Sequence, residues 1–173
     1  MSENYGFIKE KAEIKMLILF VMRHLQVPIS MGVLTELTMC DEAIKYFDVT
    51  DCIAKLVKTK HIILVNGKYS LTEKGIRNGE ALEKDLPYSV RKIAEETTAH
   101  MKAAIERDSM IKTNSIANDS GSYKVSLSLS DGIGDIISME LLAVNEKQAT
   151  TIERRFRENA EKIYHNIIQM ITD

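Results

Sequence analysis

The sequence predicts an α+β protein: an N-terminal helical half that ends in a short hairpin, and a C-terminal antiparallel meander covered by a long helix. Three observations support this class. Residues 13–25 repeat apolar side chains at helical spacing. Residues 64–75, LVNGKYSLTEKG, place an Asn-Gly pair between two short β-rich runs. Residues 124–130, KVSLSLS, alternate apolar and polar side chains with the period of a half-exposed strand.

Length and charge limit the function classes. The chain has 173 residues, enough for one compact domain or two small ones. Its 23 basic and 25 acidic side chains give a net charge of −2, and residues 1–87 carry 12 of each kind. A strongly basic chain would by itself indicate nucleic-acid binding. In this chain, any DNA-binding surface must be a local patch.

Cysteine usage and hydropathy predict a cytoplasmic protein without membrane association. Cys40 and Cys52 lack CxxC spacing, and we expect reduced, part-buried thiols. The longest apolar run, residues 16–22, is far shorter than the roughly 20 residues that span a bilayer. The charged residues ahead of this run do not form a signal-peptide pattern.

The first predicted helix has two apolar faces. One face is a regular stripe made of Ile14, Leu17, Ile18, Val21, Met22 and Leu25. Met16, Leu19 and Phe20 lie on the far side of the same helix. Because a surface helix needs only one apolar stripe, we expect burial on two sides. The second face could pack inside the helix's own domain, or against a second subunit or the C-terminal half.

Two further helices follow. Ser30 is a good N-cap for a helix that runs to about Cys40, and Ile29 and Leu34 occupy the two positions of a hydrophobic staple. We expect the third helix to begin near Asp48, which can cap it, with Asp51 in the N3 position of a capping-box-like pair. Its inward side chains would be Val49, Cys52, Ile53, Leu56 and Val57.

The hairpin leads directly into a helix start. Asn66-Gly67 supports a type I′ turn between residues 61–65 and 68–71. Thr72 is a plausible N-cap for a helix over residues 72–85, which Gly75 and Gly79 weaken. Three helices followed by a hairpin is the order of a winged helix-turn-helix domain, which we assign to residues 1–87.

Residues 88–173 are expected to form a connecting helix and a C-terminal α+β domain. The apolar stripe of residues 88–105 predicts a connecting or dimerising helix, and strands are expected near residues 110–116, 124–130 and 136–144. Residues 146–171 read as one long amphipathic helix. This domain could serve as a dimerisation platform, a small-molecule sensor or a partner-docking module.

The hairpin joint supports a family resemblance. Tyr69, Leu71, Thr72 and Gly75 look like the Y-x-L-T-x-x-G joint of bacterial winged-helix transcriptional regulators, including the PadR and MarR groups. Over its full length the chain more closely resembles an uncharacterised family of winged-helix proteins from clostridia and their relatives. The residues that carry this likeness are Ile14-Lys15, Pro28-Ile29-Ser30, Tyr46-Phe47 and Leu86-Pro87. The resemblance implies the fold and a DNA-binding role, without naming a ligand or an operator.

We therefore expect a dimeric, sequence-specific transcriptional regulator that binds double-stranded DNA. In a winged helix the third helix enters the major groove. The expected DNA-binding residues are Ser30, Thr50, Asp51, Lys55, Lys58, Lys60 and Lys68. Asp51 stands against this hypothesis because a carboxylate repels phosphate, unless it caps the helix or accepts from a cytosine. The alternative function is a winged helix used for protein–protein contact.

About four to six phosphate contacts per subunit would bind DNA weakly, so a dimer is expected. The candidate dimerisation residues are Met16, Leu19, Phe20, Val90, Ile93, Thr97 and Met101. An unidentified small-molecule effector is possible. No metal, cofactor or catalytic site is expected, because the four histidines are scattered and no HExxH, GxSxG or Walker A motif occurs.

Overall fold

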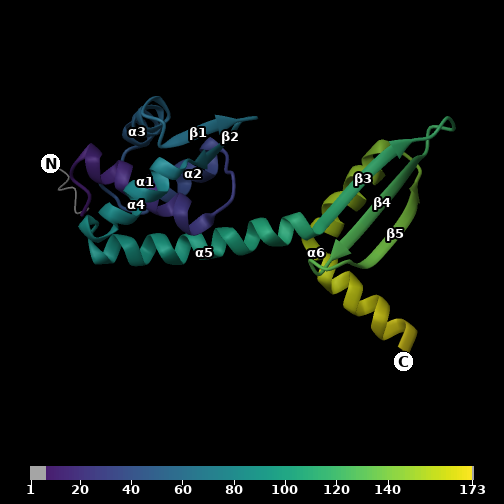
Figure 1. The fold of residues 1–173 in the computed structure, drawn as a ribbon. Coiled ribbons are helices and arrows are strands. Elements are labelled where there is room, and N and C mark those ends of the chain that lie inside the picture. Colours follow the sequence, from purple (N-terminus) through teal and green to yellow (C-terminus); the bar gives the residue numbers. More distant parts are fainter. Residues whose placement is uncertain (1–6, 173) are drawn as a thin grey trace. The chain divides into compact units, whose positions relative to one another are not determined.

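The computed structural model describes residues 7–172 and divides the chain into two compact units (Figure 1). The first unit runs to Lys102 and the second begins at Ala103, so one long helix, α5 (Tyr88–Met110), contributes to both. This helix begins one residue after the predicted domain boundary and continues five residues beyond its predicted end. Each unit has its own antiparallel sheet, and the predicted α+β class is confirmed.

The first unit follows the predicted order of helices and strands. Its elements are α1 (Lys11–Leu25), α2 (Met31–Thr38), α3 (Tyr46–Lys58), β1 (Ile62–Val65), β2 (Lys68–Leu71), α4 (Glu73–Leu82) and the 3-10 turn η1 (Glu83–Asp85). Helix α1 is the centre of this unit and contacts α2, α3, α4 and β2. All six side chains of its predicted stripe are buried.

The second face of α1 is also buried inside this unit. Leu19 is 3% exposed and Phe20 is 1% exposed, while Met16 is half-buried. Helix α4 packs against α1, and a Cβ atom added to Gly79 would come within 3.3 Å of the Leu19 Cβ. Of the two readings of this face, burial within its own domain is therefore correct for Leu19 and Phe20. The prediction that these two side chains contact a second subunit is wrong, because both are already buried within a single chain.

Two helix starts test the capping predictions. Ser30 caps α2 as predicted, since its hydroxyl accepts a hydrogen bond from the Val33 backbone N–H at 3.4 Å. The predicted start of α3 is wrong: the helix begins at Tyr46, and its N-cap is Lys45, which makes no side-chain capping bond. The Lys45 carbonyl already accepts from the N–H of Val49, so Asp48 lies within the first turn and Asp51 has no capping role.

The hairpin is anchored to the elements on both sides of it. Asn66 and Gly67 have φ values of 50° and 75°, as a type I′ turn requires. The Thr72 hydroxyl accepts from the Gly75 N–H at 3.1 Å, which caps α4, and donates to the Lys60 carbonyl at 2.7 Å. A further backbone pairing, between Ile29 and Tyr69, ties β2 to the segment before α2. The joint between hairpin and helix therefore holds β1 and β2 beside the end of α3.

The second unit is a three-stranded meander with one face covered by a helix. Its strands are β3 (Ile111–Ala117), β4 (Tyr123–Ser130) and β5 (Asp135–Ala143), in the order β3-β4-β5, and α6 (Glu146–Thr172) packs mainly over β3 and β4. The meander and its covering helix are confirmed. The core residues are Ile111, Val125, Leu127, Leu129, Ala143, Ala149, Phe156 and Ala160.

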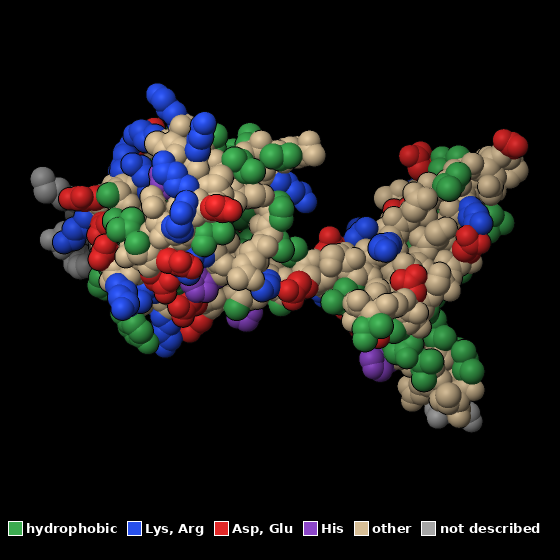
Figure 2. Space-filling model, in the orientation of Figure 1, with side chains coloured by type: hydrophobic (Ala, Val, Ile, Leu, Met, Phe, Trp, Pro, Cys, Tyr) green, Lys and Arg blue, Asp and Glu red, His purple; other side chains and the backbone are tan. Residues whose placement is uncertain are grey.

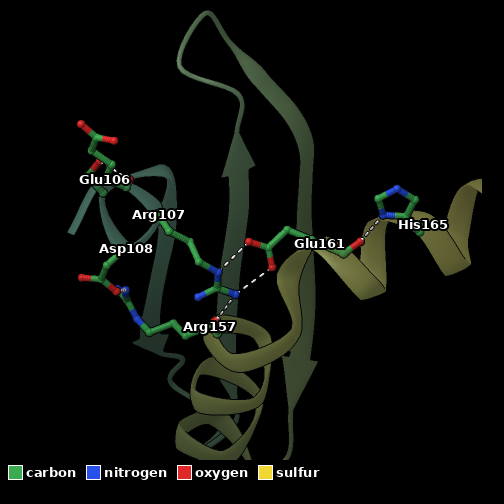
Figure 3. Close-up of polar contacts among 7 residues, drawn as sticks. Glu106, Arg107, Asp108, Arg157, Glu161 and His165 are labelled. Carbon is green, nitrogen blue, oxygen red and sulfur yellow. Dashed lines mark hydrogen bonds and ion pairs between the residues drawn. The ribbon is translucent and has the colours of Figure 1, made fainter. Parts of the chain in front are cut away.

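Polar contacts join the end of α5 to α6 within the second unit (Figure 3). The Arg107 guanidinium donates to both carboxylate oxygens of Glu161 at 2.7 Å and to the Arg157 carbonyl oxygen at 3.0 Å. Helix α6 kinks at Asn159, between these two partners. The Arg107 bond lowers the pKa of the Glu161 carboxyl, and such two-pronged contacts fix orientation as well as charge.

Candidate nucleic-acid interface

Helix α3 presents the surface on which the DNA-binding prediction rests. Of the five side chains predicted to face inward, Val49, Cys52, Ile53 and Leu56 are buried and Val57 is half-buried. Ala54, Lys55 and Lys58 are exposed on the opposite side, and Thr50 and Asp51 are half-buried at its margin. The Thr50 hydroxyl donates to the Phe47 carbonyl at 3.1 Å, so its hydrogen is already used within the helix.

Asp51 lies between two lysine side chains. Its carboxylate accepts hydrogen bonds at 2.9 Å from Lys55 of the same helix and from Lys11 at the start of α1. Lys11 also pairs with Asp48 at 3.1 Å. These bonds, Lys55 first and then Lys11, lower the pKa of Asp51 to about 2, and the two aspartates raise the pKa of Lys11. The two positive and two negative charges of this cluster balance, so the carboxylate does not leave a negative patch on α3.

Lys11 is a residue of this surface that sequence reasoning missed. It lies 40 positions before Asp51 in the chain, and no local pattern links the two. Only the packing of α1 against α3 brings them together. Its ammonium group supplies one of the two positive charges that balance Asp48 and Asp51.

The remaining predicted lysines carry charges that are not paired inside the unit. Among residues 7–172, no ion pair involves Lys58, Lys60 or Lys68, and all three are exposed. Lysine and arginine side chains gather over the region of α3 (Figure 2). Lys58 and Lys60 lie at the C-terminal end of this helix, whereas Lys68 lies at the turn of the hairpin. Since Ile29 pairs antiparallel with Tyr69, Ser30 lies beside Lys68.

His61 links the end of α3 to α4. Its ring nitrogens lie 2.7 Å from the Thr59 hydroxyl and 2.7 Å from the Asn78 amide nitrogen. Burial, and then the charges of Lys74 and Lys15, lower the pKa of this imidazole, which favours its neutral form. His61 is therefore a positioning group at the joint and adds no charge to the surface.

Apolar side chains are exposed next to the lysines. Phe47 is 82% exposed at the start of α3 and stacks edge-on against Tyr46, with ring centroids 5.8 Å apart. Ile63, Leu64 and Val65 are exposed on the hairpin. Sequence reasoning assigned Ile63, Leu64 and Val65 to the hairpin and placed Tyr46-Phe47 just before the third helix. It did not identify their exposure, which depends on what packs against α3 and β1.

The cysteine thiols are held in their protonated form. Burial raises the pKa of Cys40 to about 11 and also raises that of Cys52. A thiol with a raised pKa is a poor nucleophile, because the thiolate is the reactive species.

The predicted dimerisation stripe on α5 is split by the fold. Val90 is buried together with Ala94 and Thr98, so it faces the interior of the first unit. The prediction that Val90 contacts a second subunit is therefore wrong. Ile93 and Thr97 are exposed and Met101 is half-buried.

Within the described part of the chain, no helix combines the length and hydropathy needed to cross a bilayer.

Comparisons with known proteins give one match. No curated protein and no solved structure matches the chain significantly. A family described as "Domain of unknown function (DUF4364)" matches residues 14–171, which include nearly all of both units. The chain therefore belongs to the DUF4364 family.

Proposed function

We propose that this protein is a sequence-specific, DNA-binding transcriptional regulator whose first unit acts as a winged helix-turn-helix. The observation that carries the proposal is the exposed lysine face of α3 and its C-terminal end, where Asp51 is neutralised by Lys11 and Lys55. The capped helix α2 before α3 and the anchored hairpin after it support the same assignment. The proposal includes a cytoplasmic location and no catalytic activity or cofactor.

In the proposed complex, α3 lies in the major groove. Its N-terminal part, with Thr50 and Ala54, is closest to base edges, while Lys58 and Lys60 neutralise phosphates. The number of available lysines is small, and each phosphate contact contributes a salt-dependent share of affinity. One subunit would bind weakly, so the regulator is proposed to act as a homodimer on half-sites about 34 Å apart.

A specific observation favours the second candidate function, a winged helix that docks another protein. Phe47, Tyr46 and Leu64 expose apolar surface beside the lysines, and exposed aromatic side chains are enriched at protein interfaces. In this alternative the same face of the first unit contacts a protein instead of DNA, and the lysines form its polar rim.

The decisive experiment is fluorescence anisotropy of a labelled fragment from upstream of the protein's own gene, compared with a scrambled fragment across a salt series. Selective binding that weakens steeply with salt is expected. Lys58→Ala should reduce the slope of log K against log salt by about 0.9, the share of one phosphate. Lys84→Ala, which removes an exposed lysine from η1, is the matched control and should leave the slope unchanged.

Two results would contradict sequence-specific DNA binding. The first is equal, weak binding to both fragments; the second is a salt slope that Lys58→Ala and Lys84→Ala change equally. The docking alternative predicts instead that Phe47→Ala abolishes binding to a protein partner and leaves any weak DNA binding as it is.

A further inference from the structure

The outer edge of β5 is the least protected backbone in the second unit. Strand β5 pairs with β4 on one side, and among residues 7–172 no strand pairs with its other side. A free edge exposes a row of unpaired N–H and C=O groups, and proteins normally blunt such edges with lysine, proline, bulges or covering segments.

The opposite edge, on β3, carries such protection. Lys112 lies on this strand, and Arg157 of α6 donates to the Ile111 carbonyl at 3.3 Å and to the Thr113 hydroxyl at 3.1 Å. Strand β5 contains neither lysine, arginine nor proline. Its bulge lies at the start of the strand, opposite Leu129 and Ser130, and leaves residues 137–143 regular.

The side chains of β5 are also incompletely covered. Helix α6 packs mainly over β3 and β4, so Leu141 remains 42% exposed although it points to the covered face with its partner Val125. Leu142, on the open face, is 69% exposed. The edge therefore combines unpaired backbone with apolar surface, which is the combination that promotes strand pairing between chains.

We propose that the β5 edge is a self-association surface, at which two copies of the chain pair antiparallel across a two-fold axis. Such an interface is isologous: if residue i of one copy faces residue j of the other, then residue j of the first copy faces residue i of the second. The two meanders then form one continuous six-stranded sheet. The test of this proposal measures the oligomeric state without DNA, so its outcome does not depend on the proposed function.

Charge and side-chain pattern favour the register centred on Met139. In that register Ile137 faces the partner's Leu141 on the covered side, and Ser138 faces the partner's Glu140 on the open side. A shift to centre Glu140 would oppose two carboxylates, and a shift to centre Ser138 would place Leu141 against the partner's Asp135. A shift of the pairing by an odd number of residues would turn the apolar side chains of the covered face toward the open face of the sheet. Within its own chain Glu140 pairs with Lys124 at 2.8 Å, which reduces its repulsion of an incoming edge.

The test is sedimentation equilibrium of the full chain from micromolar to near-millimolar concentration. The expected result is a species of twice the 19.6 kDa chain mass. Leu141→Lys, which introduces a charge opposite Ile137 of the other copy, should raise the dimer Kd at least about tenfold. The matched control is Ile116→Lys, at a 57% exposed aliphatic side chain on the opposite edge strand, and it should leave the Kd unchanged.

Two variants of one exposed residue test the register by sign. Ser138→Glu places the new carboxylate opposite Glu140 of the other copy, and the two-fold axis repeats this contact. The two like-charge contacts should raise the Kd roughly 2- to 30-fold. Ser138→Lys places opposite charges there twice and should lower the Kd over the same approximate range. Far-UV circular dichroism of each variant checks that the sheet is intact.

Three results would overturn the proposal. One is a chain that stays monomeric throughout the concentration series. Another is a dimer that Leu141→Lys and Ile116→Lys weaken equally, which would locate the interface elsewhere. The third is a weaker dimer in Ser138→Lys, which would exclude the register centred on Met139.

Discussion

Single side chains set the charge of the α3 surface. Asp51 would be a repulsive group if α3 carried it alone, yet it contacts ammonium groups from two helices. Exposed ion pairs contribute little to stability, because water and salt screen them. Their effect here is electrostatic: they cancel the carboxylate and leave Lys58 and Lys60 to determine the sign of the potential near the end of α3.

The pKa of Asp51 gives the first prediction. The folded chain holds this pKa at about 2, below the ordinary 3.8. The Asp51 ion pairs therefore stabilise the fold fully when the pH is above 3.8, and this contribution is lost as the pH falls through about 2. In a carboxyl NMR titration, Lys55→Ala should raise the Asp51 pKa toward 3.8, and Lys11→Ala should raise it less.

Asp131 serves as the internal control in the same spectra. Backbone N–H groups of Gly134 and Ile133 lower its pKa, so neither lysine replacement should move it. An Asp51 pKa that stays near 2 after both lysines are removed would show that these ion pairs do not form in solution.

Gly75 gives the second prediction. A Cβ atom at this position would collide with the backbone carbonyl of His61, which cannot move without disturbing the start of the hairpin. Helix propensity alone would favour Gly75→Ala by about 1 kcal/mol. We expect the collision to reverse this sign and to lower the free energy of unfolding by about 1–3 kcal/mol, measured by urea denaturation.

The matched control is Gly32→Ala in α2. Its added Cβ meets only the Ser30 hydroxyl oxygen, at 3.9 Å, so propensity should dominate and the variant should be as stable as the parent or slightly more so. Similar stabilisation by both substitutions would mean that α4 does not approach His61 this closely.

At the scale of elements, the short hairpin depends on its neighbours. A two-stranded hairpin is marginal in isolation. Here the Thr72 hydroxyl joins α4 to the end of α3, and the Ile29–Tyr69 pairing adds a third backbone contact to β2. The hairpin and the helix that follows it are therefore expected to form together.

Thr72→Ala tests this coupling. It removes the N-cap of α4 and the bond to the Lys60 carbonyl, so the free energy of unfolding should fall by about 1–2 kcal/mol in urea denaturation. Thr72→Ser keeps the hydroxyl and should recover most of the loss. Equal losses in the two variants would assign the effect to the Thr72 methyl group instead of the hydrogen bonds.

At the scale of the whole molecule, the chain consists of two units with separate sheets and separate buried cores. The DUF4364 match runs from residue 14 to residue 171 and so includes nearly all of both. The match to the family therefore extends over both units.

The separate cores give a prediction about unfolding. Phe156 is 2% exposed at the centre of the second core, and Phe156→Ala should cost about 3–5 kcal/mol there. Hydrogen exchange should show lost protection in β3, β4 and β5, with amides of α1 and α3 unchanged. Equal loss in both units would show that they unfold as one cooperative body.

Much of the fold could be predicted from local patterns. The periodicity of residues 13–25, the Asn66-Gly67 turn, the caps Ser30 and Thr72, and the alternation of residues 124–130 each depend on side chains a few positions apart. Such patterns determined the α+β class and the order of the elements. The start of α3 was the exception, because Asp48 resembles an N-cap although the helix begins two residues earlier.

Only the tertiary structure decided the contacts between segments that are distant in the sequence. Burial of Leu19 depends on Gly79 letting α4 approach, and neutralisation of Asp51 depends on Lys11 from another helix. The uncovered edge of β5 follows from the position of α6 over β3 and β4. The sequence by itself determined which segments are helices and strands, because local spacing controls backbone hydrogen bonding. It could not determine which faces remain exposed, because exposure depends on how the segments pack.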